Sequence, residues 1–166
     1  IALGACVVPP SQSTVGTIAT ADGVGTRASI GAHASALDDR GAVPVDLGAG
    51  WIGESVAGRG TAHATYAAVS RRVAGPLWLG GRAELFWDVA GDQPRRALMA
   101  RATLRQRLAG VRWGSGDGGG ALGVLGAVAT GAYLDVGGRQ LANGGAEIVA
   151  AAGVALDLPA IAGASR

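Results

Sequence analysis

Apolar and polar side chains alternate along residues 77–108, and this alternation predicts two long β-strands joined by a turn at residues 90–94. On a helical wheel the apolar residues of the second segment scatter around the axis, with Arg101 and Arg105 among them, so a strand is favoured over a helix. In the first strand, one face carries Leu77, Leu79, Ala83, Leu85, Trp87 and Val89, and the other carries Arg82, Glu84 and Asp88. In the second strand, one face carries Leu98, Ala100, Ala102, Leu104 and Leu108, and the other carries Arg101, Thr103, Arg105 and Arg107.

The same pattern predicts further strands along most of the chain, separated by short turns rich in Gly and Asp. Short connections make neighbouring strands antiparallel. The predicted fold is all-β: an antiparallel up-and-down meander of seven or eight strands closed into a β-barrel, with a two-sheet β-sandwich as the alternative. These further strands are expected over 15–20, 27–37, 43–54, 61–73, 121–135 and 148–158. The segment 121–135 is apolar on both faces and is expected to break at Gly137-Gly138.

Two opposite barrels fit this alternation. In a soluble barrel the Leu, Val and Ala face points inward and the charged residues meet water. In an integral membrane barrel the apolar face meets lipid and the charges form a network in a narrow lumen. Either barrel makes a charge network of Arg82, Glu84, Arg101, Arg105 and Glu147, on the outer face or in the lumen.

Composition favours association with a membrane and leaves open whether the barrel spans it. The 166 residues include 30 Gly, only 16% charged residues and 4% aromatic residues, and the mean hydropathy is +0.32. A soluble domain usually carries about 25% charged residues. The low aromatic content argues against a spanning barrel, which carries aromatic girdles at both interfaces. The net charge is only +2 and the arginines are dispersed, so nucleic-acid binding is not expected.

The chain's single cysteine lies in Leu3-Gly4-Ala5-Cys6, and this tetrapeptide resembles the lipobox of bacterial lipoproteins. The resemblance implies cleavage before Cys6 and a diacylglycerol on its thiol, which would anchor the protein in lipid. It also implies sorting to the outer membrane, because Val7 stands where that family's inner-membrane retention signal has Asp.

This resemblance sets the expected organisation of the chain. Residues 1–5 are expected to be a signal-peptide remnant, 6–14 the lipidated cysteine with a flexible Pro- and Ser-containing tether, and 15–166 a single β-barrel domain. The expected location is the outer membrane, lipid-anchored at its periplasmic face or at the cell surface. The expected partners are membrane lipid, through acylated Cys6, and an envelope protein.

No residue pattern predicts catalysis, a metal or a cofactor. His33 and His63 lie on polar faces of predicted strands, but a metal site needs three or four ligands. Glu84 and Glu147 form no recognisable acid/base motif, so paired surface or lumen charges are expected. The Gly-rich segment 114–120 lacks the following helix and the Lys of a phosphate-binding loop.

The sequence therefore favours a non-catalytic envelope lipoprotein whose β-barrel acts as a structural or interaction module of the outer membrane. The alternative function is a lipocalin-like carrier or transport barrel that binds an apolar small molecule. Its distinguishing feature would be an interior cavity lined by the Leu and Val face and open at one end.

Overall fold

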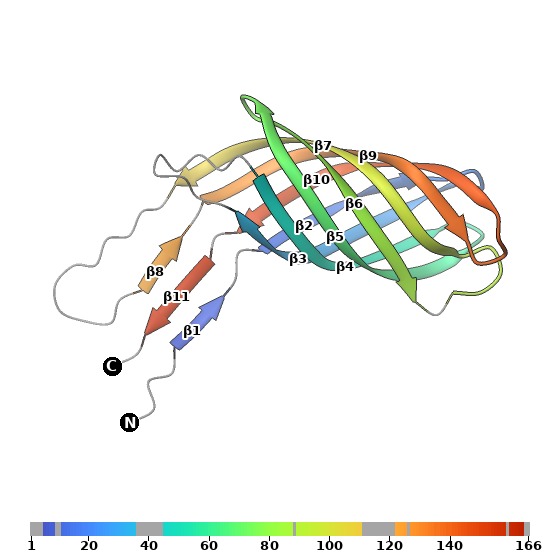
Figure 1. Cartoon of the computed structure of the whole chain (residues 1–166), viewed down its shortest axis with the longest axis horizontal. Coiled ribbons are helices and arrows are strands. Elements are labelled where there is room, and N and C mark those ends of the chain that lie inside the picture. Colours follow the sequence, from blue (N-terminus) through green and yellow to red (C-terminus); the bar gives the residue numbers. More distant parts are fainter. Residues whose placement is uncertain are drawn as a thin grey trace.

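The structure, a computed structural model, describes residues 5–8, 11–35, 45–87, 89–110, 122–125, 127–158 and 160–164. Its main body is a closed barrel of eight antiparallel strands, drawn with its axis nearly horizontal in Figure 1. The barrel strands are β2 (Ser11–Ala19), β3 (Val24–Ser35), β4 (Val45–Val56), β5 (Gly60–Ala74), β6 (Leu77–Trp87), β7 (Pro94–Gly110), β9 (Ala127–Leu141) and β10 (Ala146–Leu158). No described segment is a helix long and apolar enough to cross a bilayer.

The barrel is a meander in which each strand pairs with its neighbour along the barrel sequence, and the last strand pairs with the first. The closing seam joins β10 to β2 from Ala150 opposite Ala19 to Leu158 opposite Ser11. The predicted all-β barrel is confirmed, and the alternative two-sheet sandwich is wrong, because closure of the seam gives both end strands a partner.

Three short strands form a second sheet that the alternation does not predict. Strand β11 (Ala160–Ala164) lies in the middle, between β1 (Ala5–Val8) and β8 (Leu122–Leu125). Residues 11–14 also differ from expectation, because they belong to β2 of the barrel and were assigned to the flexible tether.

The two ends of the barrel carry different connections. The turns after β2, β4, β6 and β9 are short and lie together at one end, on the right in Figure 1. We call this end the turn end. The small sheet lies beyond the opposite end, which we call the terminal end. The predicted turn at 38–41 and the predicted Gly-rich loop at 114–120 fall outside the described residues.

Strand β9 does not break where the sequence analysis expected it to. It continues through Gly137 and Gly138 to Leu141 and pairs on both sides along this stretch. Gly137 is needed for close approach, since a Cβ there would lie 2.1 Å from the carbonyl oxygen of Leu98. The paired glycines therefore allow tight strand packing and do not end the strand.

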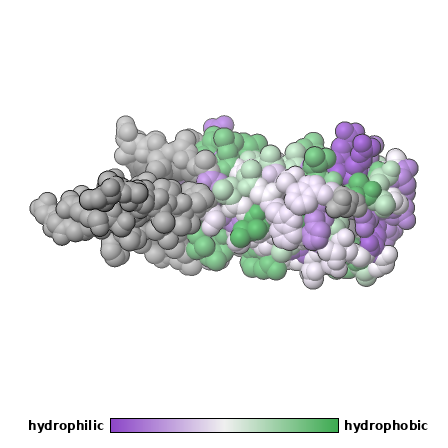
Figure 2. Space-filling model, turned by 90° about the horizontal axis from the view of Figure 1, so that it is seen from below, coloured by the Kyte–Doolittle hydropathy of each residue, from purple (hydrophilic) through white to green (hydrophobic). Residues whose placement is uncertain are grey.

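The apolar face of the strands points outward. The outer wall exposes large hydrophobic side chains from every barrel strand. Figure 2 shows hydrophobic and neutral residues over most of one side of this wall, with hydrophilic residues gathered at the turn end. Of the two barrels the alternation allows, the chain therefore forms the one with its charges inside. The exposed residues include Val15, Ile30, Leu47, Trp51, Val69, Leu79, Leu85, Leu98, Leu134, Val136, Ile148 and Val154.

Two apolar clusters help to fill the interior. In the larger one, the Tyr66 side chain reaches from β5 across β4 to β3, where a Cβ on Gly31 would lie 2.3 Å from its hydroxyl oxygen. The glycine thus leaves room for the ring inside the wall. The larger cluster holds Ile52, Ala64, Tyr66, Phe86, Ala97, Met99 and Val149, and the smaller holds Ile18, Val56, Tyr133, Ala151 and Ala155.

Candidate functional site

The lumen of the barrel is lined by ion pairs, which makes it the candidate site. Because the strands alternate, the positions opposite the apolar outer face all point inward. Most of the charged side chains there are nearly inaccessible to solvent, and each ion-pairs with at least one opposite charge. The pairs join six arginines, Arg27, Arg59, Arg82, Arg101, Arg105 and Arg139, to six carboxylates, Asp46, Glu54, Glu84, Asp135, Glu147 and Asp157.

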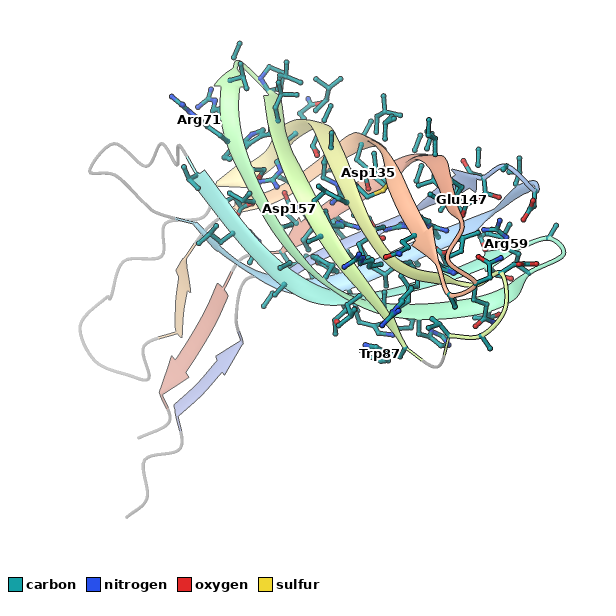
Figure 3. All side chains as sticks on the ribbon, turned by 45° about the vertical axis from the view of Figure 1, so that its right-hand side comes forward. Arg59, Arg71, Trp87, Asp135, Glu147 and Asp157 are labelled. Carbon is teal, nitrogen blue, oxygen red and sulfur yellow. The ribbon has the colours of Figure 1, made fainter. Side chains whose placement is uncertain are left out.

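A chain of ion pairs runs inward from the turn end. Arg59, in the turn between β4 and β5, donates hydrogen bonds of 2.6 Å to Glu147 and to Asp22, and Figure 3 shows Arg59 and Glu147 at this end. The bond to Glu147 raises the pKa of Arg59 above its usual value; the bond to Asp22 adds to this rise, and partial burial opposes it. Deeper in the lumen, Arg139 lies 3.9 Å from Glu147 and donates a 2.5 Å bond to Glu54.

Arg27 continues this chain toward the middle of the barrel. Its Nη1 donates a 3.0 Å hydrogen bond to Glu54, and its Nη2 pairs with Glu84. All three side chains are almost completely buried, and they come from β3, β4 and β6. Arg27 therefore connects strands that are not all neighbours in the sheet and fixes the shape of the lumen cross-section.

Asp135 is the centre of a second cluster. It accepts two hydrogen bonds from Arg101, at 2.6 and 2.7 Å, which is the two-pronged geometry that makes Arg–carboxylate pairs strong. Arg82 lies 3.9 Å from the same carboxylate, and its guanidinium packs 4.4 Å above the Tyr66 ring. The Arg101 guanidinium lies 4.8 Å from the centre of the Tyr133 ring. One buried carboxylate thus pairs with arginines from two strands.

A third cluster lies toward the terminal end of the lumen. Arg105 donates a 2.8 Å bond to Asp46 and lies 3.5 Å from Asp157. Gln12 donates a 2.6 Å bond to Asp157 from across the closing seam, and Asp46 also contacts His33 at 3.0 Å. This cluster therefore ties the seam to β4 and β7.

All five charged residues singled out from the sequence lie in the lumen, but they do not pair with one another. Arg82 and Arg101 share Asp135, and Arg105 pairs with Asp46 and Asp157. In the same way, Glu84 pairs with Arg27, and Glu147 pairs with Arg59 and Arg139.

Four of the partners that the sequence analysis missed were on predicted polar faces, whereas Asp135 was in a segment expected to be apolar on both faces. Asp46, Glu54 and Asp157 share the parity of the inward positions, as Arg27 does on its own strand. Parity could have identified them as lumen residues. It could not have paired them, because the pairs cross the lumen and depend on the strand register and on closure of the barrel.

The two histidines lie on opposite faces of the wall. His33 points inward to Asp46, whereas His63 is exposed on the outer face, where its ring stacks on Trp51 with 5.3 Å between centroids. They cannot share a metal ion. Within the described ranges, no group of three or more His, Cys, Asp or Glu side chains is placed to hold a metal.

Cys6 lies in β1, opposite Gly163 of β11. The small sheet thus holds the N-terminal segment beside the C-terminal one. Lipidation of Cys6 remains a prediction from the sequence.

No protein-family model, curated protein or solved structure matches the chain.

Proposed function

We propose that the protein is an integral β-barrel of the bacterial outer membrane, non-catalytic, that serves as a structural or interaction module of the envelope. The observation that carries this proposal is the inverted polarity of the barrel, with exposed Leu, Val and Ile outside and buried ion pairs inside. In water this arrangement would expose the apolar wall to solvent and bury charges at a cost. In a bilayer the apolar outer face contacts hydrocarbon, and the charged inner face lies in a closed polar lumen.

The distribution of charge along the wall supports the same proposal. Strand pairing aligns successive outward rows across β6, β7, β9 and β10: Ala83–Leu98–Gly138–Ile148, Gly81–Ala100–Val136–Ala150 and Leu79–Ala102–Leu134–Ala152. None of these residues is charged. Arginine enters this sector in the next row toward the turn end, at Arg96, as expected where a membrane's polar interface begins.

The alternative function, a carrier of an apolar small molecule, has less support. It requires a cavity lined by the Leu and Val face, and in the described strands those side chains lie on the outer wall. Charged pairs and apolar clusters occupy the inward positions instead.

Extraction of membranes with carbonate and urea tests the proposal. The Cys6→Ser variant removes any lipid anchor, so a spanning barrel is expected to stay in the membrane pellet through its strands alone. Release of this variant into the soluble fraction would show that the barrel does not span. Lipidation is tested separately by mass spectrometry of the mature wild-type protein, where an unmodified Cys6 would contradict the lipobox prediction.

A further inference from the structure

A groove of about 900 Å³ runs along the outer wall at the turn end. Its floor includes Gly138 on β9, whose row partners are Leu98 on β7 and Ile148 on β10. These two side chains are 70% and 79% exposed, the highest values among the exposed large hydrophobic residues of the described chain. They therefore stand as two ridges on either side of a residue that has no side chain.

The dimensions of the groove suit a hydrocarbon chain. Neighbouring strands lie about 4.8 Å apart, so the ridges on β7 and β10 are separated by roughly 10 Å across the glycine. Ala83 on β6 lies on the other side of Leu98, so the surface is low again beyond that ridge. Leu98 and Ile148 contact a methylene segment from its two sides and Gly138 lies beneath it, and further along β9 the floor rises at the exposed Val136.

A cation lies at the mouth of this groove. Arg96 occupies the next outward row toward the turn end, between Leu85 and Gln140. Its Nε donates a 2.6 Å hydrogen bond to Gln140, which orients the guanidinium, and no described residue bonds its two terminal nitrogens. The side chain is exposed, and two parallel N–H groups match the oxygens of a phosphate.

We propose that this groove binds an anionic phospholipid, with one acyl chain between Leu98 and Ile148 and the phosphate on Arg96. The assignment rests on the proposed membrane insertion, which places the groove in the apolar layer and Arg96 at the level of the headgroups. Charge complementarity selects the occupant: a guanidinium that no carboxylate of the described residues pairs with, beside an apolar groove, fits a lipid with a net negative phosphate.

Native mass spectrometry of the full chain in detergent micelles tests the site. The probes are phosphatidylglycerol, which is anionic, and phosphatidylcholine with the same acyl chains, which is zwitterionic. Wild-type protein is expected to retain one phosphatidylglycerol about tenfold more tightly than phosphatidylcholine, as a charge-assisted contact provides. Equal retention of the two lipids, or tighter retention of phosphatidylcholine, would overturn the assignment.

Two variants separate the headgroup contact from the groove. Arg96→Gln is expected to remove the preference for phosphatidylglycerol, whereas Arg71→Gln, on the outer face of β5 and far from the groove (Figure 3), is expected to keep it. Gly138→Leu is expected to abolish retention of both lipids by filling the floor. A Cβ at Gly138 meets nothing nearer than 4.0 Å, so this substitution should not prevent folding.

Gly81→Leu is the matched control for the filled groove. Gly81 also faces outward, outside the groove lining, and the nearest atom to an added Cβ is 3.6 Å away. Retention that is equal in Gly138→Leu and Gly81→Leu would overturn the proposal. Each variant is first shown to insert into vesicles; a barrel that inserts without retaining lipid refutes the site alone, whereas failure of the wild type to insert refutes the proposed function.

Discussion

At the scale of single residues, the stability of the lumen network depends most on carboxylates that pair with more than one arginine. Asp135 is completely buried, pairs closely with Arg101 and lies 3.9 Å from Arg82. Replacing a buried ion pair as a whole with apolar groups is often tolerated, but removing one partner leaves a charge without compensation in a medium of low dielectric. Asp135 is therefore expected to contribute more to the stability of the barrel than its own hydrogen bonds suggest.

Asp135→Asn is expected to lower the free energy of unfolding by about 3–5 kcal/mol, because two buried guanidinium groups lose their counter-charge. Urea unfolding in lipid vesicles, followed by tryptophan fluorescence, measures this loss. Asp92→Asn is the control, since Asp92 lies in an exposed turn and, among the residues that the structure describes, its side chain bonds only to Asn143. Equal unfolding midpoints for the two variants would contradict the role given to Asp135.

The adjacent glycines of β9 are expected to differ in how strongly the same substitution changes stability. Gly137→Ala should destabilise the barrel by about 1–3 kcal/mol, since its Cβ would lie 2.1 Å from a carbonyl oxygen of β7. An added Cβ at Gly138 meets nothing nearer than 4.0 Å, so Gly138→Ala should stay within about 0.5 kcal/mol of the wild type. The same unfolding assay compares them, and a reversed order would show that β9 has a different register.

At the scale of elements, alternation predicted the strands well wherever one face was charged. On β6, β7 and β10 the parity inferred from the sequence is the parity observed. The end of β9 was predicted wrongly because consecutive glycines usually interrupt a strand, whereas here they permit close packing against β7. The three short strands are only four or five residues long, too short for a periodic pattern to identify them.

The seam between β10 and β2 is the element whose existence the sequence supports least directly, and cross-linking tests it. In a Cys6→Ser background, cysteines replacing Thr17 and Ala152 are expected to form a disulfide on mild oxidation, since the two residues are cross-strand partners. A mobility shift on a non-reducing gel reports the bond.

Cysteines replacing Thr17 and Leu134 are the control for this seam. Leu134 lies in the same row but one strand further on, because it pairs with Ala152. Two strand spacings amount to about 10 Å, beyond the reach of a disulfide. If both pairs cross-link, or neither does, the observed closure is wrong.

At the scale of the whole molecule, polarity is distributed as in a protein whose solvent is a hydrocarbon. The sequence supplied the two unlike faces but not the choice between them, because a barrel can close with either face inside. That choice depends on the direction of strand curvature, and the small inward residues, such as Gly31 below Tyr66, help to make room for side chains inside.

The cost of a charge on the wall is expected to vary with depth. Leu134 is the middle residue of β9, and Leu134→Arg should lower the free energy of unfolding in vesicles by about 2–4 kcal/mol. Ala146 lies in the row of Arg96 at the turn end, and Ala146→Arg should lower it by at most about 1 kcal/mol. Both side chains replaced are on the outer face. Similar small losses at both positions, measured by urea unfolding, would indicate a wall surrounded by water.

The pairing of the first barrel strand with the last has a consequence for biosynthesis. As the nascent chain emerges, each hairpin up to β9 can form with its neighbour, but β2 acquires its second partner only when β10 has been made. Until then the sheet is open, and its apolar face and its arginine-rich face are both in water. Its two unpaired edge strands favour aggregation. A ribosome that stops before residue 146 would therefore release a product that needs a chaperone and cannot complete its ring.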